Sequence, residues 1–288
     1  MKKIAVISGK GGTGKTIVTG ALADQLNAKM IICDADADAS NLDLILKPEI
    51  LRRIPHAGLK IAEIDQDKCI GCGECYEFCR FDSVIDRKDG TYIIDSLKCE
   101  GCGVCGLVCP AECIELKENI CGEVFISGSP YGTVVHSELN AGSGATGLLV
   151  HEIKKNALEE ATDEDLMLID GPPGIGCPLQ STMSGTDYAL IVTEPSQSGL
   201  HDLKRLVEVL EKLPVEIFAC INKADLNPEI TEEIISYLTD SEVPMLGTIP
   251  FDKNVIESVR SGIPVTKTDS PASDAVKEIC NNLSEKIL

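Results

Sequence analysis

The chain has 288 residues, with 46 Asp and Glu against 26 Lys and Arg, a formal net charge of −20. The negative charge argues against a surface that follows phosphate backbones, and the absence of Trp with only 5 Tyr and 5 Phe argues against one that stacks bases, so nucleic acid is not an expected partner. No run approaches the ~20 apolar residues of a membrane span, and we expect a cytoplasmic protein with no membrane partner. In a reducing compartment, the 14 Cys indicate metal binding rather than disulfides.

The first predicted elements are a strand at residues 3–8, a glycine-rich loop, and a helix from Lys15 to about Ala28. The loop matches G-x-x-x-x-G-K-[ST], and strand, loop and helix are the context that a phosphate-binding P-loop requires. Lys15 is expected to reach the β- and γ-phosphates, and Thr16 to hold Mg²⁺. The predicted nucleotide-binding residues of the loop are Gly9, Lys10, Gly11, Gly12, Thr13, Gly14, Lys15 and Thr16.

A second predicted strand, residues 30–34, ends in an acidic cluster of Asp34, Asp36 and Asp38. Carboxylates at the C-terminal ends of parallel strands face the ligand crevice of an open α/β sheet. Three acids beside a phosphate site are costly without a cation, which favours a role in the nucleotide site. A solvated acidic turn is the alternative.

Ten of the 14 cysteines fall between residues 61 and 121, in a window with 13 acids and 6 bases. This composition predicts a separate module at 61–121, inserted into a single domain formed by 1–60 and 122–288. Closure entropy grows slowly with loop length, so such an insertion is tolerable. Residues 42–59 are expected to be the only connector from the acidic cluster to the module.

The window contains C-x2-C-x2-C-x3-C twice, the run of bacterial ferredoxins, in which the fourth Cys ligates the other cluster. Structural zinc is the alternative, but its sites bring together two C-x2-C pairs. The remaining thiols Cys33, Cys113, Cys121, Cys220 and Cys280 are predicted to be ordinary core or surface residues. The spacing assigns one 4Fe-4S cluster to Cys69, Cys72, Cys75 and Cys109, and a second to Cys99, Cys102, Cys105 and Cys79.

Beyond the module, strands are predicted at 166–170, 188–193, 216–221 and 245–249, with amphipathic helices between them. The alternation predicts an α/β fold with a doubly wound, mostly parallel sheet covered on both faces. The strand at 166–170 ends in Asp170, which is expected to hold Mg²⁺ together with Thr16.

The loop, with its early Lys10, resembles the deviant Walker A loop of the MinD, ParA, Mrp and nitrogenase iron protein superfamily of P-loop NTPases, which have the SIMIBI-type fold. The segment D-A-D-A-D-A-S-N-L-D-L from Asp34 resembles the switch I of that group, and D-G-P-P-G from Asp170 resembles its switch II. Over nearly all 288 positions the chain resembles one branch, the MinD-superfamily ATPases with an inserted two-cluster ferredoxin domain.

This resemblance implies a nucleotide-dependent homodimer in which Lys10 reaches across to the phosphates of the partner. The MinD alignment implies that Asp36 orients the attacking water, whereas the spacing of the iron protein favours Asp34 and Asp38. Asn222 is implied to bind adenine, although N-K-A-D from Asn222 also fits the guanine-reading pattern of GTPases, which leaves GTP as an alternative to ATP. The predicted catalytic residues are Lys10, Lys15, Asp34, Asp36, Asp38 and Asp170.

Cys177 follows Asp170 at the spacing where the iron protein has a ligand of the cluster shared between its subunits, while Ser143 stands at the other ligand position. Cys177 is therefore either a metal ligand at a dimer seam or an inert thiol. The leading hypothesis is an ATPase that couples nucleotide-driven dimer rearrangement to electron transfer through two 4Fe-4S clusters, with a redox partner. The rivals are an ATPase that assembles or delivers iron-sulfur or other metallocofactors to an apo-metalloprotein, and a regulator that senses nucleotide and redox state.

Overall fold

The computed structural model describes residues 1–36, 41–143 and 147–288, and these form two compact units. The first unit comprises Met1–Ile54, Val124–Glu138 and Ala145–Leu288, and the second comprises Pro55–Glu123 and Leu139–Gly144. The span 61–121 expected for the inserted module lies inside the second unit. No helix in the described ranges is both long and apolar enough to cross a membrane.

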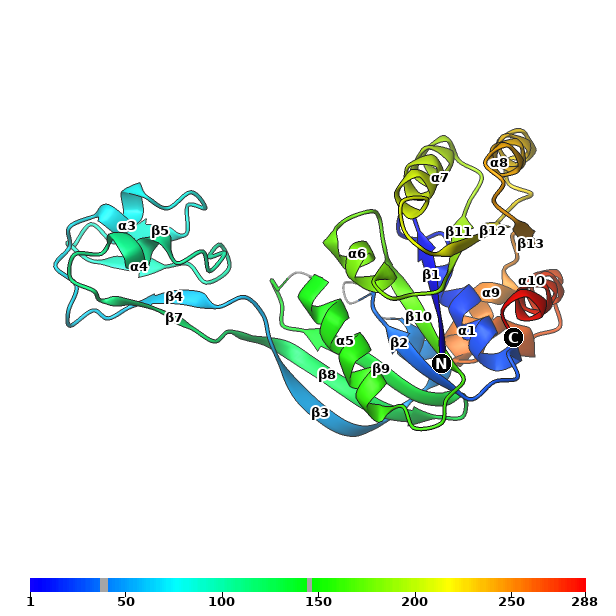
Figure 1. The fold of residues 1–288 in the computed structure, drawn as a ribbon, viewed down its shortest axis with the longest axis horizontal. Helices are drawn as coiled ribbons and strands as arrows, with labels where there is room; N and C mark the ends of the chain where they lie inside the picture. Colours follow the sequence, from blue (N-terminus) through cyan, green and yellow to red (C-terminus); the bar gives the residue numbers. More distant parts are fainter. Residues whose placement is uncertain (37–40, 144–146) are drawn as a thin grey trace. The chain divides into compact units, whose positions relative to one another are not determined.

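The first unit is built on a sheet whose strands follow the order β13-β12-β11-β1-β10-β2-β9-β8-β3 (Figure 1). The strands from β13 to β9 pair in parallel, so the predicted mostly parallel α/β sheet is confirmed. The strands that the sequence predicts are β1 (Lys2–Ser8), β2 (Met30–Asp34), β10 (Leu166–Pro173), β11 (Tyr188–Thr193), β12 (Glu216–Asn222) and β13 (Met245–Ile249).

Helices cover both faces of this sheet because its central strands are near-continuous apolar runs whose side chains need burial on both sides. Ile4 and Ile32 pack on Leu22 and Val276 in one buried cluster, while Ile31 on the other face is equally buried. The first face carries α1 (Lys15–Gln25), α2 (Leu42–Leu46), α9 (Asn254–Ser261), the 3₁₀ turn η1 (Val265–Lys267) and α10 (Pro271–Ile287). The second carries α5 (Gly147–Glu160), α6 (Cys177–Met183), α7 (Gln197–Leu210) and α8 (Pro228–Asp240).

Three strands of this sheet are absent from the sequence prediction: β3 (Glu49–Ala57), β8 (Ile120–Ser129) and β9 (Gly132–Leu139). The β3 strand reads EILRRIPHA and lies at the edge of the sheet, where charged side chains and a proline are tolerated. The expected connector, residues 42–59, contains α2 and the edge strand β3, and the boundary between the units falls within β3 and again within β8. The first helix also ends at Gln25, earlier than expected, because Leu26 is extended.

The second unit consists of two antiparallel strand pairs and two short helices. Its small core contains the apolar side chains of Ile64 and Val84 together with the thiols of Cys75 and Cys113. The elements are β4 (Ile61–Ile64) paired with β7 (Ile114–Lys117), β5 (Val84–Asp86) paired with β6 (Tyr92–Ile94), α3 (Glu74–Glu77) and α4 (Val104–Val108).

The second unit contains an internal repeat, formed by its two cysteine segments. The backbone N–H of Cys69 donates to Asp65 O at 3.1 Å, and that of Cys99 donates to Asp95 O at 3.1 Å. The helices α3 and α4 each begin after a glycine with positive φ, 82° at Gly73 and 76° at Gly103. The two C-x2-C-x2-C-x3-C segments therefore adopt the same local backbone.

Candidate nucleotide site and cysteine-lined cavities

The predicted P-loop connects β1 to α1 and bends sharply at its glycines. Gly12 and Gly14 have φ of 78° and 99°, a region where a side chain is strained, and a Cβ on Gly14 would lie 2.3 Å from Asn222 Nδ2. Lys15 is the first residue of α1 and is only 4% exposed. Thr13 Oγ1 is buried and has no hydrogen-bond partner among the described residues, as expected of a loop shaped to bind a polar ligand.

Thr16 and Asp170, the predicted Mg²⁺ residues, are in direct contact. Asp170 is fully buried inside β10, which continues to Pro173 beyond the strand end that the sequence predicted, and it accepts hydrogen bonds from Thr16 Oγ1 at 2.7 Å and Thr19 Oγ1 at 2.9 Å. Burial raises the pKa of Asp170 to about 6, although Lys15 and the two hydroxyls favour its ionised form. A hydroxyl beside a carboxylate at the start of the P-loop helix fits the oxygen ligands that Mg²⁺ prefers.

This raised pKa predicts a pH-dependent stability. The pKa of Asp170 is above its ordinary value of 3.8, so between about pH 4 and pH 6 the metal-free folded chain binds more protons than the unfolded chain and loses stability as pH rises. In Asp170→Asn this loss is absent. Without Mg²⁺, we therefore expect the unfolding free energy of the variant, relative to that of wild type, to rise by about 1–3 kcal/mol from pH 5 to pH 7.5. Urea unfolding at both pH values measures it, with Asp240→Asn as the surface control; an equal stability difference at both pH values would contradict the prediction.

Of the three switch I acids, two lie within the described residues. Asp36 Oδ2 is 3.4 Å from Lys15 Nζ, and both side chains are buried. Asp34 accepts from the backbone N–H of Asp36 at 3.2 Å and of Leu42 at 3.4 Å, so it links the end of β2 to the start of α2. Asp38 lies outside the described residues. Which of the three orients water stays a prediction.

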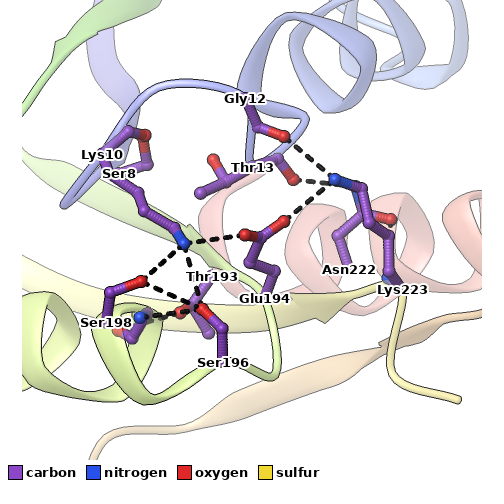
Figure 2. A network of polar contacts seen from close by, with 11 residues as sticks. Ser8, Lys10, Gly12, Thr13, Thr193, Glu194, Ser196, Ser198, Asn222 and Lys223 are labelled. Atoms are coloured by element: carbon purple, nitrogen blue, oxygen red, sulfur yellow. Dashed lines mark hydrogen bonds and ion pairs between the residues drawn. The ribbon is translucent and has the colours of Figure 1, made fainter. Parts of the chain in front are cut away.

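Lys10 extends from the P-loop into a polar network on the adjacent strand end (Figure 2). Its Nζ lies 2.8 Å from Glu194 Oε1 and donates to Ser196 Oγ at 3.0 Å and Ser198 Oγ at 2.9 Å. Burial opposes ionisation of Glu194, but hydrogen bonds from Lys10 and Lys223 outweigh it and lower the pKa of this carboxyl. In a single chain the early lysine is therefore paired within its own subunit.

Asn222 and Lys223 hold the other side of the loop (Figure 2). Asn222 Nδ2 donates to Thr13 O at 2.7 Å, and Lys223 Nζ donates to Gly12 O at 3.1 Å and lies 2.9 Å from Glu194 Oε2. These bonds anchor the loop to the end of β12. A contact between Asn222 and a base stays a prediction.

The sequence analysis missed Glu194, Lys223 and Thr19. Glu194 directly follows β11, and β11 pairs with the P-loop strand β1, so the rule applied to Asp34 and Asp170 extends to it. The sequence does show an acidic residue directly after a predicted strand, but only the order of the strands shows that this strand lies beside the P-loop strand. Thr19 is one helical turn after Lys15 and faces Asp170 for that reason.

The cysteines of the second unit line two small cavities. Each cavity gathers three cysteines of one C-x2-C-x2-C run and the fourth cysteine of the other run, as the spacing predicted. The first is lined by Cys69, Cys72, Cys75 and Cys109, together with Cys113. The second is lined by Cys79, Cys99, Cys102 and Cys105.

The fourth cysteine of each run lies against the turn that follows it. Burial opposes ionisation of Cys79, but hydrogen bonds from Ser83 and from backbone N–H groups of Phe81 and Val84 lower its pKa. The pKa of Cys109 is likewise lowered, against the effect of burial, by backbone N–H groups of its own turn. N–H groups directed at these two sulfur atoms suit negatively charged thiolates.

Within the described part of the chain, no three His, Cys, Asp or Glu residues converge closely enough to hold a single metal ion. The assignment of an iron-sulfur cluster to each cavity stays a prediction. Cys177 is exposed as the first residue of α6 in the first unit, whereas Ser143 belongs to the second unit, and a metal-binding role for Cys177 stays a prediction. The C-terminal end of α6 is held by Lys154, whose Nζ donates to Thr182 O at 2.6 Å and Ser184 O at 2.7 Å.

The chain belongs to the CobQ/CobB/MinD/ParA nucleotide-binding domain family, whose model matches residues 4–265. It is 34% identical over 287 residues to the uncharacterized protein MJ0578 of Methanocaldococcus jannaschii, covering 99% of this chain and 97% of that protein. The fold is similar to that of MinD from Pyrococcus horikoshii, solved in complex with Mg-ADP, with a TM-score of 0.59 and 21% identity over 98% of this chain and 95% of the other.

A shorter similarity links the chain to a cytosolic Fe-S cluster assembly factor, the Nubp1 homolog of Drosophila willistoni. The two are 26% identical over 141 residues, which cover 42% of this chain and 46% of that protein.

Proposed function

We propose that this protein is an ATP-hydrolysing iron-sulfur protein, in which nucleotide-dependent rearrangement of a homodimer is coupled to electron transfer through two 4Fe-4S clusters. The observation that carries the proposal is the presence, in one chain, of a family P-loop with a paired Thr16 and Asp170 and of two cavities each lined by four cysteines.

The nucleotide half of the proposal rests on the loop and on the residues around it. Gly12 and Gly14 allow the backbone to curve so that its N–H groups cradle phosphates, and Lys15 at the start of α1 supplies positive charge beside them. Thr16 and Asp170 are suited to hold Mg²⁺, the second through water. The Mg-ADP in the Pyrococcus horikoshii protein favours adenine over guanine as the base.

Hydrolysis requires stabilisation of charge on the departing γ-phosphoryl group. Lys10 is the residue we assign to this, acting on the phosphates of the partner subunit in the dimer. To do so it must leave Glu194, Ser196 and Ser198, and Glu194 then keeps one cationic partner, Lys223. The exchange of Lys10 from its own subunit to its partner supplies a link between ATP binding and dimer formation.

The cluster half rests on the donor set of each cavity. Four thiolates are the ligands of a 4Fe-4S cluster, and each binds a different iron, so the sulfurs surround the cluster instead of converging on one ion. When bound, each cluster supplies a one-electron carrier. The chain contributes N–H groups at Cys79 and Cys109, which tune cluster potentials, and glycines such as Gly71, where a Cβ would clash with Gly90 O at 2.4 Å.

The two halves are joined covalently through the segment that follows the predicted switch I. Asp34 binds the backbone N–H of Leu42, the first residue of α2, and α2 is followed by β3, within which the boundary between the units falls. A change of switch I with the γ-phosphate is thus transmitted into a strand that continues into the cysteine module.

The test is a redox titration of the reconstituted chain without nucleotide, with ADP and with a non-hydrolysable ATP analogue. We expect ATP-analogue binding to shift the midpoint potential of at least one cluster by about 59 mV or more, a tenfold change in the equilibrium for one electron. Lys15→Ala is the control and is expected to show no shift. Potentials that are the same in all three nucleotide states would rule out the coupling.

The similarity to the Nubp1 homolog favours a second candidate function, delivery of an iron-sulfur cluster or another metallocofactor to an apo-metalloprotein. Mixing the loaded chain with an apo-acceptor separates the two candidates. Loss of iron from this chain with gain in the acceptor supports delivery, whereas stable clusters that exchange electrons support electron transfer.

A further inference from the structure

The first cavity contains one more cysteine than a 4Fe-4S cluster requires. Cys113 is 4% exposed and lines this cavity together with Cys69, Cys72, Cys75 and Cys109. Its Sγ lies 3.4 Å from Cys109 Sγ, which is van der Waals contact. The sequence analysis treated Cys113 as an ordinary thiol, and its burial agrees with that, but its neighbours are the predicted cluster ligands.

The internal repeat provides a built-in comparison for this residue. Ser83 stands in the second cavity where Cys113 stands in the first, four residues after the fourth cysteine of its run. Ser83 Oγ is 3.2 Å from Cys79 Sγ, so the same turn places both side chains. The preceding residues, Asp82 and Glu112, have φ of 50° and 48°, which folds the chain back toward the cysteine in each half.

We propose that Cys113 is an alternative ligand for the iron corner assigned to Cys109. In the exchange, the bond from iron to Cys109 Sγ breaks as the bond from iron to Cys113 Sγ forms. The proton released by Cys113 goes to Cys109, and no iron changes oxidation state. The inference rests on the proposed function, because it requires a cluster in this cavity.

The contact between the two sulfur atoms makes this exchange a local one. Because the turn already holds Cys113 Sγ 3.4 Å from Cys109 Sγ, we expect the exchange to involve the side chains of this turn and not a refolding of the unit. The second cavity lacks this option, since Ser83 offers a hydroxyl where iron-sulfur clusters favour soft thiolates. We therefore expect the cluster in the first cavity to tolerate loss of Cys109 better than the cluster in the second cavity tolerates loss of Cys79.

The experiment compares Cys109→Ala with Cys79→Ala in the full chain, reconstituted without oxygen, by iron and sulfide content and by EPR of the reduced protein. Cys109→Ala is expected to keep both clusters, with a changed EPR signal for one. Cys79→Ala and the double variant Cys109→Ala/Cys113→Ser are expected to lose about half of the iron or to hold one three-iron cluster.

A gain-of-function variant keeps the test decisive if a single variant folds poorly. Adding Ser83→Cys to Cys79→Ala places a thiol at the equivalent position, and it is expected to restore the second cluster. Equal iron loss in Cys109→Ala and Cys79→Ala, with no recovery on Ser83→Cys, would overturn the role of Cys113 and leave the proposed function intact. A wild-type chain that takes up no 4Fe-4S cluster would overturn both.

Discussion

Replacement of Lys10 by alanine is expected to lower ATP hydrolysis by on the order of 10³, the loss seen when a cation at the transferring phosphoryl group is removed. Binding of the nucleotide to the single chain is expected to change little, because in that state Lys10 pairs with Glu194 and Ser198 instead of lining the loop. The measurement is steady-state phosphate release alongside nucleotide binding. Lys204→Ala, on the exposed side of α7, is the matched control and should leave both unchanged.

Mixing variants tells whether Lys10 acts within its own chain or on its partner. A Lys10→Ala chain keeps Lys15 but has no lysine to donate, whereas a Lys15→Ala chain has a damaged loop but can donate Lys10. If Lys10 acts across the dimer, mixing two inactive variants restores a fraction of the activity. Activity that stays absent in the mixture, while both variants still dimerise, would place Lys10 in its own site and contradict the assignment.

Removal of iron is expected to unfold the cysteine-lined unit while the P-loop unit stays folded. Among the residues that the structure describes, the core cluster of this unit has only Ile64 and Val84 as buried apolar side chains beside the thiols of Cys75 and Cys113, and the apolar residues packed against it are partly exposed. A core of this size supplies little stability alone, so cluster binding contributes folding free energy directly. In the first unit, by contrast, an extensive buried core joins the sheet to α1 and α10.

Limited proteolysis with mass spectrometry measures this. After chelation, cleavage is expected throughout 61–121 and to leave the rest protected, with two separate transitions on heating. Asp240→Asn, which changes an exposed carboxylate at the end of α8, is the control and should leave iron content and the cleavage pattern unchanged. A cysteine unit that stays as resistant without iron as with it would show that the clusters are not needed for its fold.

The elements that could be predicted are those whose pattern is local. The buried strands β1, β2 and β10 are near-continuous apolar runs. The spacing of glycines and lysine in the loop up to Lys15 is specific to phosphate-binding loops. The edge strand β3 could not be predicted, because its charged residues and Pro55 read as a connector and are tolerated at a sheet edge.

Within the candidate site, local spacing was enough to predict Lys15, Thr16 and Asp170, which the structure brings together. Thr19 and Glu194 were missed for a common reason. Each contacts a partner far away in the sequence: Thr19 reaches Asp170 because β10 lies beside β1, and Glu194 reaches Lys10 because β11 lies on the other side of β1.

The sequence by itself determined the family loop and the two cysteine runs, because a P-loop and a C-x2-C-x2-C-x3-C segment each impose their geometry over a few successive residues. Only the tertiary structure decided that Lys10 meets Glu194, and that Cys113 lies beside Cys109 where Ser83 lies beside Cys79. The first contact depends on β11 lying next to β1. The others depend on turns through positive φ at Asp82 and Glu112, a conformation in which Asp is enriched but which nothing in the sequence predicts for Glu112.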